Sequence, residues 1–183
     1  MIPKEAKLVY RGRLFEVYNW EQEQFDGTFK TYEQLRRRSS VTILPITADN
    51  KIMLCEEEQP ARGKFLSTPG GQIDDGEKPE AAAVRELLEE TGYEGKLKFW
   101  METHPYRNKI DWTVHNYIAH DIRKISDQKL DAGERVRPFF VDFDEFIDVV
   151  LNNDDFRNVE LTLAVINAMR KHDGIEQLKK LFF

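Results

Sequence analysis

The sequence predicts a single α/β domain in which antiparallel strands come first and helices and further strands follow. Three observations lead to this prediction. Aromatic and β-favouring residues flank an Asp-Gly turn near the N-terminus, and the run VTILPIT at 41–47 is apolar enough for the centre of a sheet. A proline and a glycine bracket a helix from Pro79 to Thr91. With 183 residues, the domain is expected to span 1–183.

The N-terminal part, residues 1–40, is expected to contain an antiparallel strand pair. Its strands run from 8 to 20 and from 28 to 38, joined at Phe25-Asp26-Gly27. A second hairpin-like pair, 41–47 and 51–57, follows about Asp49-Asn50. The chain therefore begins with four strands.

The second half combines strands and helices. Residues 96–103, 112–120 and 135–143 are predicted strands, with a polar loop at 121–133. Asp144 is expected to cap a helix from 145 to 151. Residues 160–171 form an amphipathic pattern whose inward positions are Leu161, Val165, Ile166 and Met169. A last short helix at 175–183 is expected to pack on the domain or a partner through Leu178, Leu181 and Phe182.

Composition limits the classes of function. Hydrophobic residues make up 40% and charged residues 33%, which is typical of a globular chain. No apolar run is long enough for a membrane helix or a secretory signal, so we expect a cytoplasmic protein without membrane partners. The net charge of −6 argues against nucleic-acid binding as the main role, but not against a phosphorylated small molecule. Cys55, the single cysteine, is expected to be buried on a strand.

The helix at 79–91 carries the clearest chemical signal. At about 100° per residue, its acidic side presents the carboxylates of Glu86, Glu89 and Glu90. Its opposite side is apolar and is expected to be buried, with Val84, Leu87 and Leu88. Neighbouring carboxylates repel one another unless a cation compensates them, and Mg²⁺ suits carboxylates combined with substrate phosphates. The alternative is an ordinary solvated acidic face.

The loop before the helix strengthens the metal-site interpretation. Gly70 and Gly71 allow the backbone to turn sharply and approach a ligand closely. Arg85 can orient a carboxylate through a bidentate contact, and Glu77 can reach toward Arg85. Loop and helix together can direct backbone carbonyls and carboxylates toward one metal ion.

The stretch 71–93, GQIDDGEKPEAAAVRELLEETGY, resembles the Nudix box, the motif of the Nudix hydrolase superfamily, at every defined position. The resemblance implies an α/β/α sandwich around a mixed β-sheet, and Mg²⁺- or Mn²⁺-dependent hydrolysis of a nucleoside diphosphate linked to another group. It further implies metal ligation by Glu86, Glu89, Glu90 and the Gly70 carbonyl. Structural roles fall to the remaining motif residues Gly71, Glu77, Arg85 and Gly92.

Outside the box, the chain is similar to the ADP-ribose pyrophosphatase and nucleoside diphosphate sugar branch. Strands precede VTILPIT, and Glu58-Gln59 is followed by an arginine before the glycine turn. Arg62 follows that pair after two residues, whereas the branch usually has one. The resemblance implies that residues 1–40 form a homodimer whose partner chain helps to hold the substrate.

For the reaction itself, a base must deprotonate water while cations neutralise the phosphate oxygens. The resemblance places Glu134 at the position of the base, with Glu89 or Glu90 as the competing choice. Arg62, Lys64 and Arg37 are candidates for contact with the phosphates, and a solvated surface role is the alternative for each. Aromatic candidates for a nucleobase platform include Trp112.

Two other functions remain open at this point. The chain could be a Nudix hydrolase of nucleoside triphosphates or dinucleotides. It could also be a module that senses nucleotide metabolites without turnover, although such a module has no need of mutually repelling carboxylates.

Overall fold

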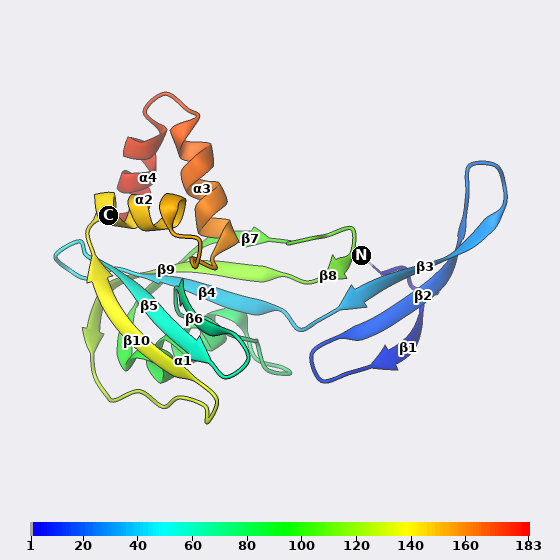
Figure 1. Cartoon of the computed structure of the whole chain (residues 1–183), viewed down its shortest axis with the longest axis horizontal. Helices are drawn as coiled ribbons and strands as arrows, with labels where there is room; N and C mark the ends of the chain where they lie inside the picture. Colours follow the sequence, from blue (N-terminus) through cyan, green and yellow to red (C-terminus); the bar gives the residue numbers. More distant parts are fainter. Residues whose placement is uncertain (1) are drawn as a thin grey trace.

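The computed structural model describes residues 2–183, whose strands form three small sheets (Figure 1). The N-terminal sheet contains β1 (Lys7–Arg11), β2 (Glu16–Glu23), β3 (Phe29–Arg36) and β8 (Ile110–Asp111). Figure 1 shows that β1–β3 project to one side of the remaining molecule. The single strand predicted for 8–20 is wrong, because the chain reverses between β1 and β2, where the Gly12 amide donates to the Phe15 carbonyl over 2.8 Å.

The other strands form two sheets of three. One has the order β4 (Ser40–Pro45), β9 (Val114–Lys124), β7 (Tyr93–Thr103), and the other β10 (Arg135–Val141), β5 (Ile52–Gln59), β6 (Gly63–Ser67). The predicted hairpin-like pair of 41–47 and 51–57 is present only at its turn, where Ile46 and Ile52 form an antiparallel bridge and the Thr47 amide donates to the Lys51 carbonyl over 2.9 Å. The ladder of β4 is instead parallel and is formed with β9. The predicted central place of β4 is wrong, because it ends the order of its sheet. Strand β6 was not predicted.

Four helices cover these sheets: α1 (Pro79–Thr91), α2 (Phe143–Asn152), α3 (Val159–Met169) and α4 (Gly174–Phe182). Helix α1 lies on one side of the sheets, and α2–α4 gather on the other, which gives the expected α/β/α arrangement (Figure 1). Helix α1 has the predicted bounds, and Gly92 ends it with a φ of 76°. Within the described residues, no helix is both long and apolar enough to span a membrane.

The cap predicted at Asp144 is wrong, because the helix begins two residues earlier. The Asp142 side chain accepts a hydrogen bond from the Glu145 amide over 2.9 Å, and Phe143 is the first helical residue. Both aspartates suit a cap by residue type. Burial of Phe143, which is 5% exposed, fixes the earlier start.

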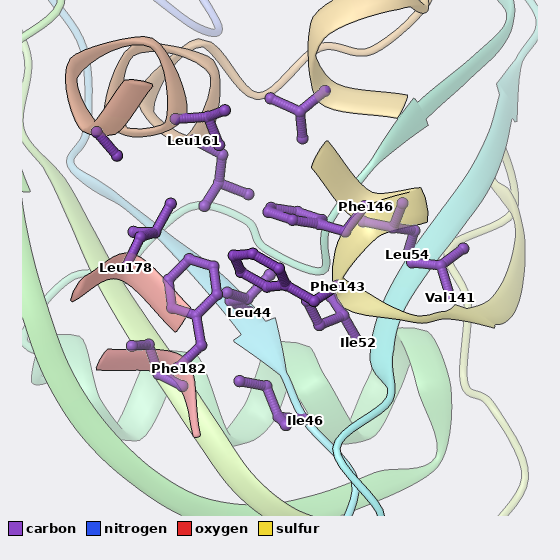
Figure 2. Packing of buried hydrophobic residues seen from close by; sticks show 14 residues of the cluster. Leu44, Ile46, Ile52, Leu54, Val141, Phe143, Phe146, Leu161, Leu178 and Phe182 are labelled. Carbon is purple, nitrogen blue, oxygen red and sulfur yellow. The ribbon is translucent and has the colours of Figure 1, made fainter. Parts of the chain in front are cut away.

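Two apolar clusters lie on opposite faces of β4 and β5. Leu44, Ile46, Ile52 and Leu54 pack against α2–α4, where Phe143, Phe146 and Phe182 meet (Figure 2). The alternate residues Val41, Ile43 and Met53 pack against Ala82, Ala83 and Leu87 of α1. The apolar run VTILPIT is therefore explained by burial on both faces, even though β4 is an edge strand.

Several side-chain predictions can be compared with these clusters. Cys55, Leu161, Val165, Leu178 and Phe182 are buried, and Leu181 is half-buried against the α2–α4 cluster, as predicted. Three inward assignments are wrong, since Val84, Ile166 and Met169 are exposed. A helical wheel predicts the buried positions from periodicity alone. In the structure, the small residues Ala82 and Ala83 allow α1 to approach the sheet.

Candidate active site

Residues of the loop at 67–72 form one wall of a cavity of about 320 Å³, and the glycines of this loop contact Glu86 and Glu90 of helix α1. The Val41 amide donates to the Gly71 carbonyl and the Ile43 amide to the Pro69 carbonyl, both over 2.9 Å, so the loop is held along β4. A Cβ at Gly71 would overlap the carboxylate of Glu86. Glycine at this position therefore lets the Glu86 carboxylate lie directly against the loop backbone.

Arg85 organises the acidic residues around it. Its Nε and Nη2 donate to the two carboxylate oxygens of Glu77 over 3.0 and 2.8 Å, and Nη2 also donates to the Gln72 carbonyl over 3.0 Å. Its Nη1 contacts Glu86 at 2.8 Å and Glu89 at 3.3 Å. The hydrogen bonds from Arg85 lower the pKa of Glu77 to about 2. Arg85 and Glu77 thus join the loop to the helix.

Glu90 lies on the buried side of α1, although the sequence suggested an exposed acidic face. It follows Ala83 and Leu87 along the stripe that packs on the sheet, and it is 9% exposed. The Gly70 amide donates to its Oε2 over 3.0 Å. Burial first, and then the nearby Glu57 carboxylate, raise the pKa of Glu90 well above its ordinary value.

Glu57 is a site residue that sequence reasoning missed. It continues the face of β5 that carries Met53 and Cys55 toward α1, and it lines the cavity. The Ser67 hydroxyl donates to its carboxylate, while burial raises its pKa. The signal was present in IMLCEEEQ, where alternation places Glu57 at an inward position of an apolar strand.

Glu86 and Glu134 complete the acidic cluster. Burial raises the pKa of Glu86 against the opposing effect of Arg85, and burial followed by Asp131 raises that of Glu134. The charge of Glu134 acts on Glu57, Glu86 and Glu90, so the loop before β10 comes close to the α1 carboxylates. Glu89 is more exposed and contacts only Arg85 among these groups.

The donor set fits a hard divalent cation. The carboxylates of Glu57, Glu86 and Glu90 are buried or half-buried, and burial and mutual repulsion disfavour their charged forms; a cation would relieve both effects. In the described chain, no three acidic, cysteine or histidine side chains already enclose a common point. Glu86 is held by Arg85 and Glu90 by the Gly70 amide, so ligation requires these side chains to turn toward the ion.

The opposite part of the cavity is basic. Arg37 stacks on Trp112, with its guanidinium carbon 4.2 Å from the ring centroid, and its Nε has no hydrogen-bond partner among residues 2–183. Burial, and then the neighbouring Arg62, lower the pKa of Arg37. The charge of Arg62 also acts on Glu57, but neither Arg37 nor Arg62 forms an ion pair within the described residues, so both guanidinium groups are available to an anion.

The arginine run 36–38 separates into three different environments. Arg36 pairs with Asp111 at 3.3 Å, and Arg38 pairs with Asp75 at 2.8 Å, while Arg37 alone lines the cavity. Lys64 does not line it, because its Nζ contacts Glu56 at 3.3 Å on the other side of β6 from Phe65. The structure therefore brings together Arg37 and Arg62 but leaves Lys64 outside.

Arg157 and Asn158 also line the cavity and were not predicted. Asn158 Nδ2 donates to the hydroxyl of Thr68 over 2.8 Å, a contact across 90 residues of sequence. No local spacing signals such a contact. Trp112, one of the aromatic candidates, is fixed by a 3.0 Å hydrogen bond from its Nε1 to Ser40 Oγ.

Comparison with known proteins agrees with this geometry. The NUDIX domain model matches residues 36–163. The chain is 30% identical over 150 residues to the methanol dehydrogenase activator of Bacillus methanolicus, covering 80% of this chain and 75% of that protein. It is 27% identical over 146 residues to the ADP-ribose pyrophosphatase of Bacillus subtilis, covering 78% of each. A crystal structure of an ADP compounds hydrolase superposes with a TM-score of 0.74 at 26% identity, covering 91% of both chains.

The family model spans well over half of the chain, and it includes the glycine loop, the carboxylates of α1 and the basic wall up to Asn158. The fold predicted from the sequence is thereby confirmed. The chain belongs to the Nudix hydrolase family and is a Nudix-type pyrophosphohydrolase that resembles ADP-ribose pyrophosphatases.

Proposed function

We propose that the protein hydrolyses the pyrophosphate bond of ADP-ribose or a related nucleoside diphosphate sugar, giving a nucleoside monophosphate and a sugar phosphate. The observation that carries this proposal is one cavity lined by Glu57, Arg37 and Arg62 and by two glycines, Gly70 and Gly71, that contact the carboxylates of Glu90 and Glu86. A diphosphate in this cavity would lie between a metal held by the α1 carboxylates and the guanidinium groups.

Glu86, Glu90 and the Gly70 carbonyl would hold Mg²⁺ or Mn²⁺, with Glu89 as a further ligand. When bound, the ion neutralises charge on the diphosphate and makes the attacking water more acidic. Gly71 allows Glu86 to approach, and Arg85 and Glu77 keep α1 in register with the loop. These contacts give the ligands their positions before substrate arrives.

Glu134 is the proposed base. Its raised pKa makes it a better proton acceptor than an ordinary carboxylate, and it lies close enough to influence the titration of Glu57, Glu86 and Glu90. Glu89 is the competing choice, since it lies on the same helix face as Glu86 and is half-exposed. Comparing Glu134→Gln with Glu89→Gln would separate them, because loss of the base lowers kcat and removes the acidic limb of its pH profile.

Arg37 and Arg62 are the proposed phosphate contacts. Their mutual proximity is unfavourable in the free protein and becomes favourable once phosphate oxygens lie between them. Trp112 offers the aromatic surface that a nucleobase needs, beside the same arginine. Lys64 would act only if its contact with Glu56 were broken.

We also propose a homodimer formed through residues 1–40. The N-terminal sheet exposes a group of large apolar side chains, which for a projecting sheet indicates a protein interface. The group consists of Leu8, Val9, Tyr10, Phe29 and Tyr32. A partner chain would cover these residues.

The test is to incubate the purified protein with ADP-ribose, nucleoside diphosphate sugars, dinucleoside polyphosphates and nucleoside triphosphates, with Mg²⁺, Mn²⁺ or EDTA, and to identify the products. Metal-dependent formation of AMP and ribose 5-phosphate from ADP-ribose, or the matching pair from another nucleotide sugar, is expected. Pyrophosphate released from triphosphates alone would support the alternative substrate class. Binding without turnover would support a sensing module.

A variant links this activity to the metal site. Glu90→Gln removes charge but little volume, so turnover should fall by orders of magnitude while the circular dichroism spectrum is retained. Unchanged turnover would reject the proposed ligand set.

A further inference from the structure

The connection between α2 and α3 is bonded to the sheet beside the cavity. The Leu66 amide donates to the Asp155 carbonyl over 2.9 Å, and the Arg157 amide donates to the Leu66 carbonyl over 2.8 Å. Phe156 thus forms a parallel bridge with Leu66 on β6. These bonds fix the backbone of 155–157 and place the next side chains against the cavity.

Asn158 has an unused acceptor. The side chain is 7% exposed, and while its Nδ2 donates to Thr68, its Oδ1 has no hydrogen-bond partner within residues 2–183. It does not cap α3, because the helix start has no side-chain cap hydrogen bond. A buried carbonyl oxygen without a donor is unfavourable, so an arriving donor would be bound well.

Arg157 lies beside this acceptor and carries an uncompensated charge. Its guanidinium carbon lies 5.3 Å from the centroid of the Phe65 ring, and it forms no ion pair with a carboxylate in the described chain. Phe65 is paired with Glu57 in the ladder of β5 and β6. Arg157 therefore lies on the side of the cavity that carries Glu57.

The two ends of the loop at 67–72 contact different residues. Thr68, near its start, contacts Asn158, whereas Gln72, near its end, bridges to Ser40, which holds Trp112. Trp112 is the one aromatic residue among those that line the cavity. A nucleobase needs such a platform, while the carbonyl of Asn158 suits a hydroxyl donor.

From this arrangement we propose that Arg157 and Asn158 recognise the sugar phosphate half of the substrate. Asn158 Oδ1 accepts a hydrogen bond from a sugar hydroxyl, and Arg157 contacts the phosphate attached to that sugar. The nucleoside half lies toward Trp112. This inference rests on the proposed hydrolysis of a nucleoside diphosphate sugar, and it assigns a specificity role to a segment outside the Nudix box.

The test measures binding of the two products separately, in Mg²⁺, by isothermal titration calorimetry. Asn158→Leu and Arg157→Gln should each weaken binding of ribose 5-phosphate or glucose 1-phosphate about tenfold, the usual effect of losing one good hydrogen bond, and leave AMP binding unchanged. Asn167→Leu on the exposed side of α3 and Arg170→Gln at its end are matched controls and should change neither. Arg157 is exposed, so Arg157→Gln should fold and test the proposed sugar phosphate contact even if Asn158→Leu fails to fold.

The outcomes separate this inference from the proposed function. If the wild-type protein cleaves a nucleotide sugar but both variants keep sugar phosphate affinity, or lose AMP affinity instead, the assignment of 157–158 is wrong and the function stands. If the wild type cleaves no nucleotide sugar and binds neither sugar phosphate, the proposed function is wrong and this inference is rejected with it.

Discussion

Replacing Arg85 with methionine should destabilise the metal-free protein by about 3 kcal/mol, because it removes the group that neutralises three carboxylates. The Arg85 side chain is 28% exposed, and its partners Glu77 and Glu86 are 17% and 13% exposed, which places these pairs between the surface and buried cases. Exposed pairs contribute about 0–1 kcal/mol, and breaking a buried pair costs about 3–5 kcal/mol. The bidentate geometry with Glu77 favours the upper part of that interval, and the exposed Glu89 contact adds little.

The assay is urea denaturation in EDTA at pH 7, followed by circular dichroism, with the m-value compared between proteins. For a chain of this length the expected loss lowers Tm by about 6–12 °C. The matched control is Arg123→Met, which removes an arginine from an ion pair with Glu94 whose partners are 76% and 41% exposed. The control should cost less than about 1 kcal/mol. An Arg85→Met loss no larger than that of the control would refute the reasoning that Arg85 holds the loop and helix together.

Three further predictions follow from the site and the N-terminal sheet. Burial raises the pKa values of Glu57, Glu86 and Glu90 above the ordinary value of 4.5, so these groups bind protons more readily in the folded metal-free protein than in the unfolded chain. Burial lowers the pKa of His120, which acts in the opposite direction, but three carboxylates outnumber this one group, and the Tm should rise as pH falls from 8 toward 5. A flat or falling Tm would contradict this, and saturating Mg²⁺ should weaken the trend. Gly71→Ala should lower kcat at least tenfold and change Tm by only a few degrees, because the new Cβ displaces the movable end of the Glu86 side chain rather than backbone. Activity assays and calorimetry would measure both effects, and full activity would show that the close approach of Glu86 to the loop is unimportant. Phe29→Glu should yield monomers in size-exclusion chromatography with light scattering if the exposed N-terminal sheet is the dimer interface, and an unchanged mass would reject that interface.

The carboxylate helix could be predicted closely because its signals are local. Pro79 and Gly92 set its ends through backbone geometry, and a fixed spacing brings Glu86, Glu89 and Glu90 within one turn. Which side chains of this helix are buried could not be predicted as closely. A helical wheel shows where each side chain points, but the depth of burial depends on how α1 packs on the sheet. The close packing at Ala82 and Ala83 buries Glu90 and leaves Val84 exposed.

The strand pairing of β4, in contrast to the carboxylate helix, could not be predicted from local signals. The turn at Asp49-Asn50 suggested that β4 pairs with β5, and the two strands do meet at the bridge between Ile46 and Ile52. The ladder of β4 is formed with β9, and β5 pairs with β10 as well as with the neighbouring β6; β9 and β10 lie far along the chain. A local turn can be recognised from a few residues, whereas the choice of ladder partner depends on burying both faces of β4 at once.

The chemistry of this protein could be predicted from local residue spacing, because the Nudix box places its glycines, glutamates and arginine within a segment whose local geometry is nearly fixed. The residues that surround the box depend instead on long-range packing. This packing brought Glu57 of β5 beside Glu90, separated Arg37 from Arg36 and Arg38, and placed Asn158 against Thr68. These contacts join elements far apart in sequence, and they arise from packing two apolar clusters on opposite faces of the sheets, which no short-range spacing encodes.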